Sequence, residues 1–290
     1  GRELTALMLG ADISQSEIFA HATGLNYLLR AGYMPGLEAA GTLIEIGGQD
    51  SKLITFDPDG APAYFNMNTI CSAGTGEFLK QLADEAGMRI EDLGRIALTS
   101  TAPAMIDATC TVFSKRDFRH LTQKGVPLAD RLMGACMAMV RNYVRNVVRD
   151  VRLQPPVFFQ GGVAANEAVR LGFERELGTD VHVMAEAGVA GALGMAAVVL
   201  EAASRGRWTT RFRSDYAKRG FNTRASYCRG CANRCSLSQP YEVLAGREVI
   251  VDTLGGRCDG CRDPRNVVAG AAAGRDGDAV SARPSGSPGL

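Results

Sequence analysis

The sequence has almost no excess of charge of either sign. Its 290 residues hold 32 Lys and Arg against 31 Asp and Glu, a formal net charge of +1. Such a balance gives no general reason to expect nucleic acid or an anionic membrane as a partner. The sequence also lacks a run of about 18–20 uninterrupted apolar residues and a recognisable signal peptide. We therefore expect a cytoplasmic protein without a membrane-spanning segment.

A secreted disulfide framework is excluded by how the cysteines are distributed. Three of the eight are scattered singly through a Gly/Ala-rich body and five are clustered near the end: Cys71, Cys110 and Cys136, then Cys228, Cys231, Cys235, Cys258 and Cys261. Disulfide frameworks belong to small, Cys-dense domains, which the first two hundred or so residues do not resemble. A reducing compartment with metal or cluster thiolates fits better.

Strand and helix patterns alternate along the body of the chain. Apolar spacing predicts strands at 42–46, 52–56, 63–65, 157–160 and 181–184, with a turn at 57–60. It predicts helices at 13–30, 74–87, 127–151, 166–176 and 188–203. The alternation indicates an α/β domain over 1–203. We expect a basic linker at 204–225, a Cys-rich metal-binding segment at 226–262 and a tail without packed structure at 263–290.

The first candidate phosphate site is a glycine pair between two predicted strands. Gly47 and Gly48 allow backbone N–H groups to approach a phosphate closely. Asp50 is the candidate catalytic residue, because its carboxylate can position Mg²⁺ or a water. The remaining candidates around the phosphates are Gln49, Ser51 and Lys52. The alternative is an ordinary glycine hairpin.

A second glycine pair, Gly161 and Gly162, lies between a predicted strand and a predicted helix. Such a turn can hold an adenosine against the backbone, with Asn166 at the helix that follows. The alternative is a tight strand-to-helix connection. No GxxxxGK[ST] P-loop is present. Two separate glycine pairs instead suggest an actin/hexokinase/Hsp70-like (ribonuclease H-like) ATPase fold.

Cys71 and Cys110 each precede a predicted helix. The positive end of a helix dipole favours thiolate, the form that binds iron. Two cysteines do not complete a four-thiolate cluster, but a two-fold dimer supplies four. The alternative is two unconnected buried cysteines, which fits Cys136 on the apolar stripe of the long helix.

Four motifs together resemble one family. They are Gly47-Gly48-Gln49-Asp50, Cys71-Ser72-Ala73-Gly74-Thr75-Gly76, Cys110-Thr111-Val112-Phe113 and Gly161-Gly162-Val163-Ala164. Their order and spacing are similar to those of the BcrA/BadF-type ATPases, the activators of 2-hydroxyacyl-CoA dehydratases, over about residues 1–203. The resemblance implies a homodimer that binds MgATP and holds one [4Fe–4S] cluster through Cys71 and Cys110 of each subunit.

The resemblance also implies a function and its partners. ATP would open the dimer, and the cluster would pass low-potential electrons to a 2-hydroxyacyl-CoA dehydratase or an acyl-CoA reductase. Ferredoxin or flavodoxin would be the electron donor. We expect Gly74, Thr75 and Gly76 to form the helix N-terminus that couples nucleotide state to Cys71.

Three departures from the family pattern affect this expectation. The N-terminal Asp-Gly hairpin has no counterpart, so we expect a fragment that begins partway through the first half of the domain. Lys115 and Arg116 stand where acidic residues are usual, which would alter docking to the partner enzyme. The Cys-rich extension resembles that of long, multidomain members.

The C-terminal cysteines form a candidate metal site. We expect Cys228, Cys231, Cys235 and Cys258 to bind Zn²⁺ or a second iron–sulfur cluster, with Cys261 as a spare. The alternative is a set of free surface thiols. Two further functions stay open: a small-metabolite kinase of the same fold, which leaves Cys71 and Cys110 without a role, and a non-enzymatic metal-binding module.

Overall fold

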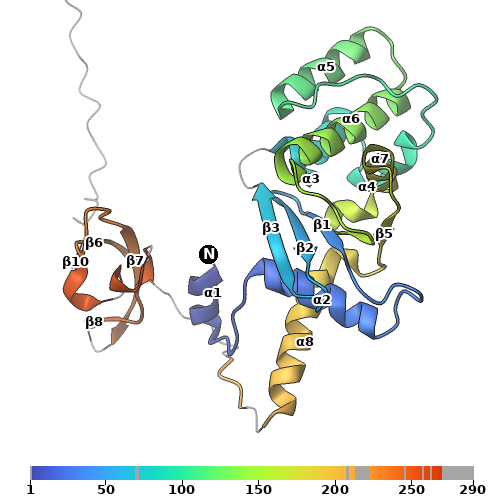
Figure 1. Ribbon diagram of the computed structural model, residues 1–290. Coiled ribbons are helices and arrows are strands. Elements are labelled where there is room, and N and C mark those ends of the chain that lie inside the picture. Colours follow the sequence, from blue (N-terminus) through green and yellow to red (C-terminus); the bar gives the residue numbers. More distant parts are fainter. Residues whose placement is uncertain are drawn as a thin grey trace, which may run out of the picture. The chain divides into compact units, whose positions relative to one another are not determined.

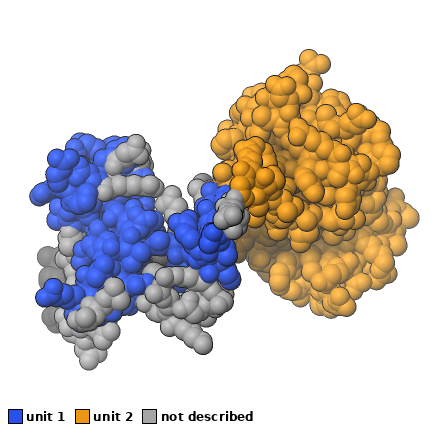
Figure 2. All heavy atoms as spheres, turned by 90° about the horizontal axis from the view of Figure 1, so that it is seen from below, with its two compact units in different colours: residues 1–14, 209–290 blue, residues 15–208 orange. Residues whose placement is uncertain are grey.

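The computed structural model describes residues 2–68, 72–206, 209–212, 222–244, 246–256, 258–261 and 263–269. The chain forms two compact units, coloured separately in Figure 2. The larger unit contains residues 15–208, and the smaller contains residues 1–14 and 209–290. Cys71 lies outside the described residues. The domain limits expected at residues 203, 225 and 262 stay predictions.

The larger unit is built on a five-stranded mixed sheet with the order β3-β2-β1-β4-β5 (Figure 1). The first three strands are antiparallel, whereas β4 is parallel to β1 and β5 to β4. The strands are β1 (Thr42–Ile46), β2 (Ser51–Phe56), β3 (Pro62–Asn68), β4 (Val157–Gln160) and β5 (Val181–Val183). Every strand predicted in this unit is therefore confirmed.

Helices cover both faces of this sheet (Figure 1). Leu43 and Phe158 point to the face covered by α2 (Glu17–Arg30), and Leu193 of α8 (Ala190–Ser204) packs on the same side. The next residue along each of these strands points to the opposite face, as the two-residue period of a strand requires. That face packs against α3 (Gly76–Glu85), α4 (Ile90–Ala97), α6 (Leu128–Tyr143) and α7 (Glu167–Leu177).

The helix predictions are confirmed in position, with differences at their ends. Helix α2 begins at Glu17 because the Ser16 hydroxyl accepts a hydrogen bond from the Phe19 amide. The long helix predicted to end at residue 151 ends as α-helix at Tyr143, and a π-helical turn covers 144–148. Helices α1 (Arg2–Leu9) and α4 were not predicted, because a two-turn helix gives a weak periodic signal.

Helices α2 and α8 cross at two glycines. A Cβ on Gly24 would lie 2.2 Å from the Ala190 carbonyl oxygen, and one on Gly194 would lie 1.8 Å from the Ala20 carbonyl oxygen. The backbones therefore touch directly. The segment Ala187–Ser204 is long and apolar enough to cross a membrane by length and composition alone, although no such span was expected. Only 17% of this segment is buried, and one such helix is weak evidence for a membrane span.

The smaller unit contains α1 and a second sheet of order β10-β6-β7-β8, with β9 paired to β7. The two stretches of chain that form this unit are joined at Asp12, whose carboxylate accepts hydrogen bonds from the Thr210 hydroxyl and the Arg211 amide. The strands are β6 (Asn222–Cys228), β7 (Ser236–Leu244), β8 (Arg247–Ile250), β9 (Leu254–Gly255) and β10 (Val267–Ala269). Cys228 and Cys261 form a small core with Leu237.

Candidate functional site

Three glycine-bearing segments meet above the carboxyl ends of β1 and β4. They are the Gly47–Gly48 turn, Gly76 at the start of α3, and Gly161 after β4, and we call them the glycine junction. The Gly76 amide donates to the Gly47 carbonyl at 2.9 Å, and the Glu77 amide donates to the Gly48 carbonyl at 2.7 Å. The turn of the β1–β2 hairpin is thus fixed to the N-terminus of α3.

Glycine is required where these segments touch. Gly161 has a φ of +88°, and a Cβ there would lie 2.2 Å from the Ile46 carbonyl oxygen. A Cβ on Gly76 would lie 2.9 Å from the Val163 side chain. Gly48 and Gly162 differ, because they are exposed and no atom lies within 4 Å of a Cβ placed on either. Their backbones face open space, where a phosphate chain has room.

A buried ion network lies under the junction on the α2 face of the sheet. The Lys52 ammonium is 2.8 Å from Glu45 Oε2, 3.0 Å from Asp50 Oδ1 and 3.3 Å from Glu17 Oε2. Only 1% of the Lys52 side chain is exposed, against 31% for Asp50 and 64% for Glu17. The candidate residue Lys52 is therefore surrounded by carboxylates, and its predicted contact with phosphate oxygens stays a prediction.

Burial and charge pairing act in opposite directions on this network. Burial raises the pKa of Glu45, although the hydrogen bond and the charge of Lys52 oppose the rise. Burial alone would lower the pKa of Lys52, but the hydrogen bonds and charges of Glu45 and Asp50 outweigh it and raise that pKa. Lys52 therefore stays a cation at neutral pH and holds the two carboxylates beside the Gly47–Gly48 turn.

Two more polar side chains extend the network toward β4. His21 Nδ1 lies 3.2 Å from Gln160 Oε1, and His21 Nε2 lies 4.0 Å from Glu45 Oε1. Gln160 is 1% exposed, and its Nε2 has no hydrogen-bond partner in the described part of the chain. A donor buried in this way beside Gly161 is suited to an incoming acceptor such as a phosphate oxygen or a water.

A pocket of about 330 Å³ adjoins the junction on the other face of the sheet. It lies between α4, the start of α3 and the turn that leads into α7, and its walls are mostly apolar. A Cβ on Gly94 would lie 2.6 Å from Asn166 Oδ1, so the pocket is open there because residue 94 is glycine. The lining residues are Gly76, Leu79, Ile90, Glu91, Gly94, Arg95, Leu98, Val163, Ala165, Asn166 and Glu167.

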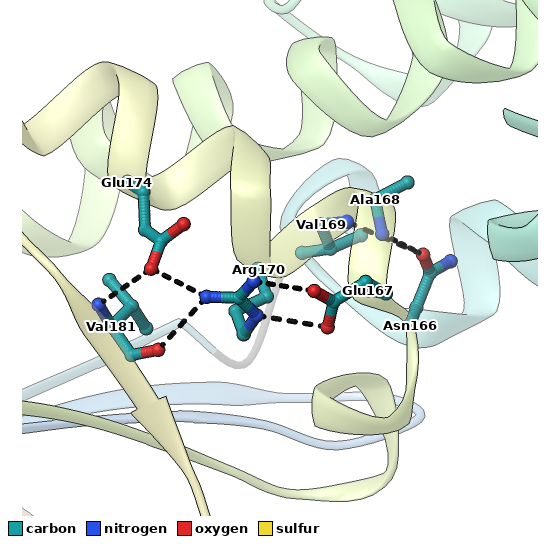
Figure 3. Close-up of polar contacts among 7 residues, drawn as sticks. All are labelled: Asn166, Glu167, Ala168, Val169, Arg170, Glu174 and Val181. Atoms are coloured by element: carbon teal, nitrogen blue, oxygen red, sulfur yellow. Dashed lines mark hydrogen bonds and ion pairs between the residues drawn. The ribbon is translucent and has the colours of Figure 1, made fainter. Parts of the chain in front are cut away.

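Asn166 fixes the beginning of α7 beside this pocket. Its side-chain oxygen accepts hydrogen bonds from the Ala168 and Val169 amides at 3.1 and 3.3 Å (Figure 3). One turn on, Arg170 donates to Glu167 at 2.9 Å and to Glu174 at 2.5 Å. Figure 3 also shows Glu174 accepting the Val181 amide of β5. The pocket wall is therefore rigidly attached to the sheet.

Cys110 is the N-cap of α5 (Thr111–Gln123), as predicted, and is partly exposed. The preceding loop is held firmly, because the Ser114 hydroxyl donates to the carbonyls of Asp107 and Cys110 at 2.7 and 2.9 Å. Met105 and Val112 nearby are 83% and 73% exposed. An accessible thiol at a helix N-terminus is suited to bind a metal cluster, although its expected companion Cys71 is not described.

The other cysteines divide into two groups. Cys136 is fully buried in the core, as predicted, and burial raises the pKa of its thiol to about 12. In the smaller unit, Cys258 Sγ lies 4.0 Å from Cys261 Sγ, and the Gly230 amide donates to Cys228 Sγ at 3.4 Å. Among the described residues, no three His, Cys, Asp or Glu side chains are grouped to hold a metal. The set that includes exposed Cys231 and partly buried Cys235 stays a prediction.

The structure thus brings most of the candidates into one place. Gly47, Gly48, Gly76 and Gly161 form the junction, Gln49 lies exposed on the turn beside them, and Asn166 borders the pocket. Gly74 and Thr75 are buried just before α3. Glu45 was missed, although the hairpin register pairs it with Lys52 and could have revealed it. No comparable feature of the sequence pointed to Gln160 or to α4 as part of the site.

Lys115 and Arg116, the basic residues that follow Cys110, are both paired. Lys115 Nζ is 3.0 Å from Glu85 Oε1, and Arg116 is 2.8 Å from Asp117 Oδ1. Arg116 also stacks on the Phe113 ring. These pairs reduce the positive charge that this surface offers to a partner.

Comparison with protein families gives a match over most of the chain. The sequence model of the BadF/BadG/BcrA/BcrD ATPase family matches residues 1–200. The chain is 32% identical over 186 residues to the 2-hydroxyisocaproyl-CoA dehydratase activator of Clostridioides difficile, covering 64% of this chain and 66% of that protein. It is 33% identical over 195 residues to the (R)-2-hydroxyglutaryl-CoA dehydratase activating ATPase of Acidaminococcus fermentans, covering 67% and 71%. The chain thus spans about two thirds of these relatives.

Solved structures agree with these matches. The A. fermentans (R)-2-hydroxyglutaryl-CoA dehydratase component A has a TM-score of 0.61 and 32% identity, covering 67% of this chain and 71% of that one. The C. difficile activator with bound ADPNP has a TM-score of 0.61 and 29% identity, covering 69% and 73%. The predicted actin/hexokinase/Hsp70-like ATPase fold is confirmed.

Proposed function

The chain belongs to the BadF/BadG/BcrA/BcrD ATPase family, and on that premise we propose that it is an ATP-dependent activator of a 2-hydroxyacyl-CoA dehydratase or a related reductase. Two of its relatives are dehydratase activators, and another is a benzoyl-CoA reductase subunit. The observation that carries the proposal is the glycine junction next to an apolar pocket. Phosphates need close backbone approach, and an adenine needs an apolar slot, so the two together suit ATP.

We place the phosphates against the exposed backbones of Gly48 and Gly162 and the adenosine in the pocket beside Asn166. Asp50 lies at the edge of the junction and is proposed to hold Mg²⁺ or the attacking water. Lys52 would then act on Asp50 and Glu45 and keep both carboxylates oriented. Gln49 is exposed on the same turn and free to reach a phosphate.

The proposed electron-transfer role depends on a [4Fe–4S] cluster shared by a homodimer. Cys110 and Cys71 of each subunit would hold it, and when bound the cluster would supply a low-potential electron to the dehydratase. Cys110 supports this proposal by its partial exposure and its place at the N-terminus of α5. The exposed Met105, Val112 and Phe113 would exclude water from the shared interface. Ferredoxin or flavodoxin would be the electron donor, in the cytoplasm.

The smaller unit is proposed to bind a metal of its own through Cys228, Cys231, Cys235 and Cys258. Two observations favour a metal in this unit: the NH–S hydrogen bond from Gly230 to Cys228, and a core of Cys228, Leu237 and Cys261 that is too small to be stable on apolar burial alone. Thiolate sets of this kind hold Zn²⁺ or iron–sulfur clusters.

Nucleotide binding tests the first part of the proposal. Titration with a fluorescent ADP analogue and Mg²⁺ should show saturable binding to the full chain. Gly94→Leu should remove it, because even the first side-chain carbon would lie 2.6 Å from Asn166 Oδ1. Gly206→Ala is the control, because a Cβ there meets nothing within 4 Å. Binding that Gly94→Leu leaves intact would place the nucleotide elsewhere.

Anaerobic purification tests the second part. Iron and sulfide should be present at about four of each per dimer, as a [4Fe–4S] cluster requires, in addition to any held at the C-terminal site. The content should fall to the level of the C-terminal site in Cys110→Ala and in Cys71→Ala. A dimer whose iron content is the same in both variants as in the wild type would contradict the bridging cluster.

A further inference from the structure

Asn142, near the end of α6, lies between the glycine junction and Cys110. It is fully buried. Its Nδ2 donates hydrogen bonds to the carbonyl oxygens of Ala108 and Thr109, at 2.6 and 3.2 Å. Thr109 is the residue before Cys110, so one amide group fixes the backbone that leads into the α5 N-cap.

The other end of the same amide faces the start of α3. Asn142 Oδ1 is buried and has no hydrogen-bond partner in the described part of the chain. A Cβ placed on Gly74 would lie 2.9 Å from this oxygen, so the two segments are in contact only because residue 74 is glycine. A buried acceptor without a partner is costly in a native protein, and its retention calls for an explanation.

The segment that Asn142 touches is tied to the proposed phosphate site. Gly74 is two residues from Gly76, whose amide donates to the Gly47 carbonyl at 2.9 Å. The next amide along α3, that of Glu77, donates to the Gly48 carbonyl at 2.7 Å. A movement of the Gly47–Gly48 turn therefore moves the residues that lie against Asn142.

We propose that Asn142 is a positioning residue that couples occupancy of the glycine junction to the position of Cys110. The inference rests on the proposed nucleotide site. A shift of Gly74 changes the space around Asn142 Oδ1, the side chain follows, and its two Nδ2 hydrogen bonds carry the shift to Ala108 and Thr109. The amide is planar and rigid, with Nδ2 bonded to backbone carbonyls and Oδ1 lying against Gly74, so a displacement at one end is carried to the other.

The reactivity of the Cys110 thiol measures this coupling without the cluster. The full chain, freed of metal, is alkylated with iodoacetamide with and without MgADP, and peptide mass spectrometry gives the rate at Cys110. We expect MgADP to change the wild-type rate by about fivefold or more, the lower end of allosteric couplings. In Asn142→Ala the ratio should fall to about 1, while MgADP still binds, with an affinity altered by no more than the coupling factor itself.

Asn146→Ala is the control, since this partly exposed asparagine lies four residues further along, and its side chain has no hydrogen bond to either segment among the described residues. Buried Cys136 reports folding in every variant, because it should stay unlabelled in the native protein. Gly74→Ala provides a second test, because it pushes a methyl group onto Asn142 Oδ1. Its effect on the Cys110 rate should disappear when it is combined with Asn142→Ala.

The outcomes separate the inference from the proposed function. If MgADP does not bind the wild type, the nucleotide site fails and the coupling fails with it. If MgADP binds and Asn142→Ala responds at Cys110 as the wild type does, the coupling is wrong and the nucleotide site stands. A wild-type rate that bound MgADP leaves unchanged overturns the coupling as well.

Discussion

Replacing Lys52 with methionine tests the buried ion network under the glycine junction. Methionine has a similar length and fills the space, but it leaves Glu45 without a cation. Glu45 is 4% exposed, and the Lys52 ammonium 2.8 Å away is the nearest of the charges around it. Removing one partner of a buried pair destabilises proteins by about 3–5 kcal/mol, because the remaining charge is buried and uncompensated.

The expected change in melting temperature follows from this figure. For a domain of 150–250 residues, 1 kcal/mol lowers Tm by about 2–4 °C, so Lys52→Met should lower it by about 6–20 °C. Lys80→Met is the control, because Lys80 forms an ion pair with Asp84 in which both side chains are more than half exposed. Exposed pairs contribute little, so we expect no resolvable shift there.

The loss should depend on pH in a defined direction. Burial already raises the pKa of Glu45 in the native protein, and without Lys52 it should rise further. A carboxyl whose pKa is higher in the folded than in the unfolded state favours folding when protonated, and this advantage is lost as pH rises through the folded value. The Tm deficit of Lys52→Met should therefore be smaller at about pH 5 than at about pH 8.

Differential scanning fluorimetry of the wild type, Lys52→Met, Lys80→Met and the double variant Glu45→Gln/Lys52→Met at both pH values would measure this. The double variant should recover part of the lost stability and lose the pH dependence, because no buried carboxylate is left unpaired at residue 45. A deficit of equal size at both pH values, or one that the double variant shares in full, would refute the electrostatic explanation.

Three further predictions follow from single positions. Gly161→Ala should lower Tm and weaken ADP binding, because a Cβ there would lie 2.2 Å from a main-chain oxygen of β1. Gly162→Ala should keep the wild-type Tm, because a Cβ there meets nothing within 4 Å. Equal Tm values for the two variants in a thermal melt would contradict this. Cys136 should resist iodoacetamide in the native protein up to about pH 9, because burial raises its pKa to about 12; peptide mapping checks this, and rapid labelling would mean that the core opens. Cys228→Ser should remove the metal of the smaller unit and Cys261→Ser should not, as measured by elemental analysis. The reverse result would mean that Cys261, and not Cys228, is the metal ligand.

The fold of the larger unit was predictable because its signals are local, whereas no strand of the second sheet was predicted. Strands β1 and β4 are short, mostly apolar segments buried on both faces, and each is followed by a glycine pair. The π-helical turn after Tyr143 and the short helix α4 were not predictable, because both depend on tertiary packing rather than on apolar spacing.

The site was predictable only where glycine or a charged turn residue marks it. Gly47, Gly48 and Gly161 stand out in the sequence because they belong to glycine pairs, although a close backbone approach excludes other residues only at Gly161. Gln160 and Asn142 do not, since an amide in an apolar strand or helix has the same local pattern whether or not it has a partner. Gln160 Nε2 and Asn142 Oδ1, which have no partner in the described part of the chain, can be recognised only from the folded structure, where β1 lies beside β4 and α6 beside the loop before Cys110.

The end of α6 joins these two parts of the molecule through consecutive residues. The Tyr143 hydroxyl donates to the Lys52 carbonyl in β2 at 2.7 Å, while Asn142, one position earlier, holds the loop before Cys110. Because neighbouring residues of a helix point about 100° apart, one turn can contact both the β1–β2 hairpin and the loop before Cys110. The π-helical turn begins at the next residue and changes the register of the helix where these contacts end. The end of α6 therefore fixes the position of the loop before Cys110 relative to the β1–β2 hairpin, where we propose that the nucleotide binds.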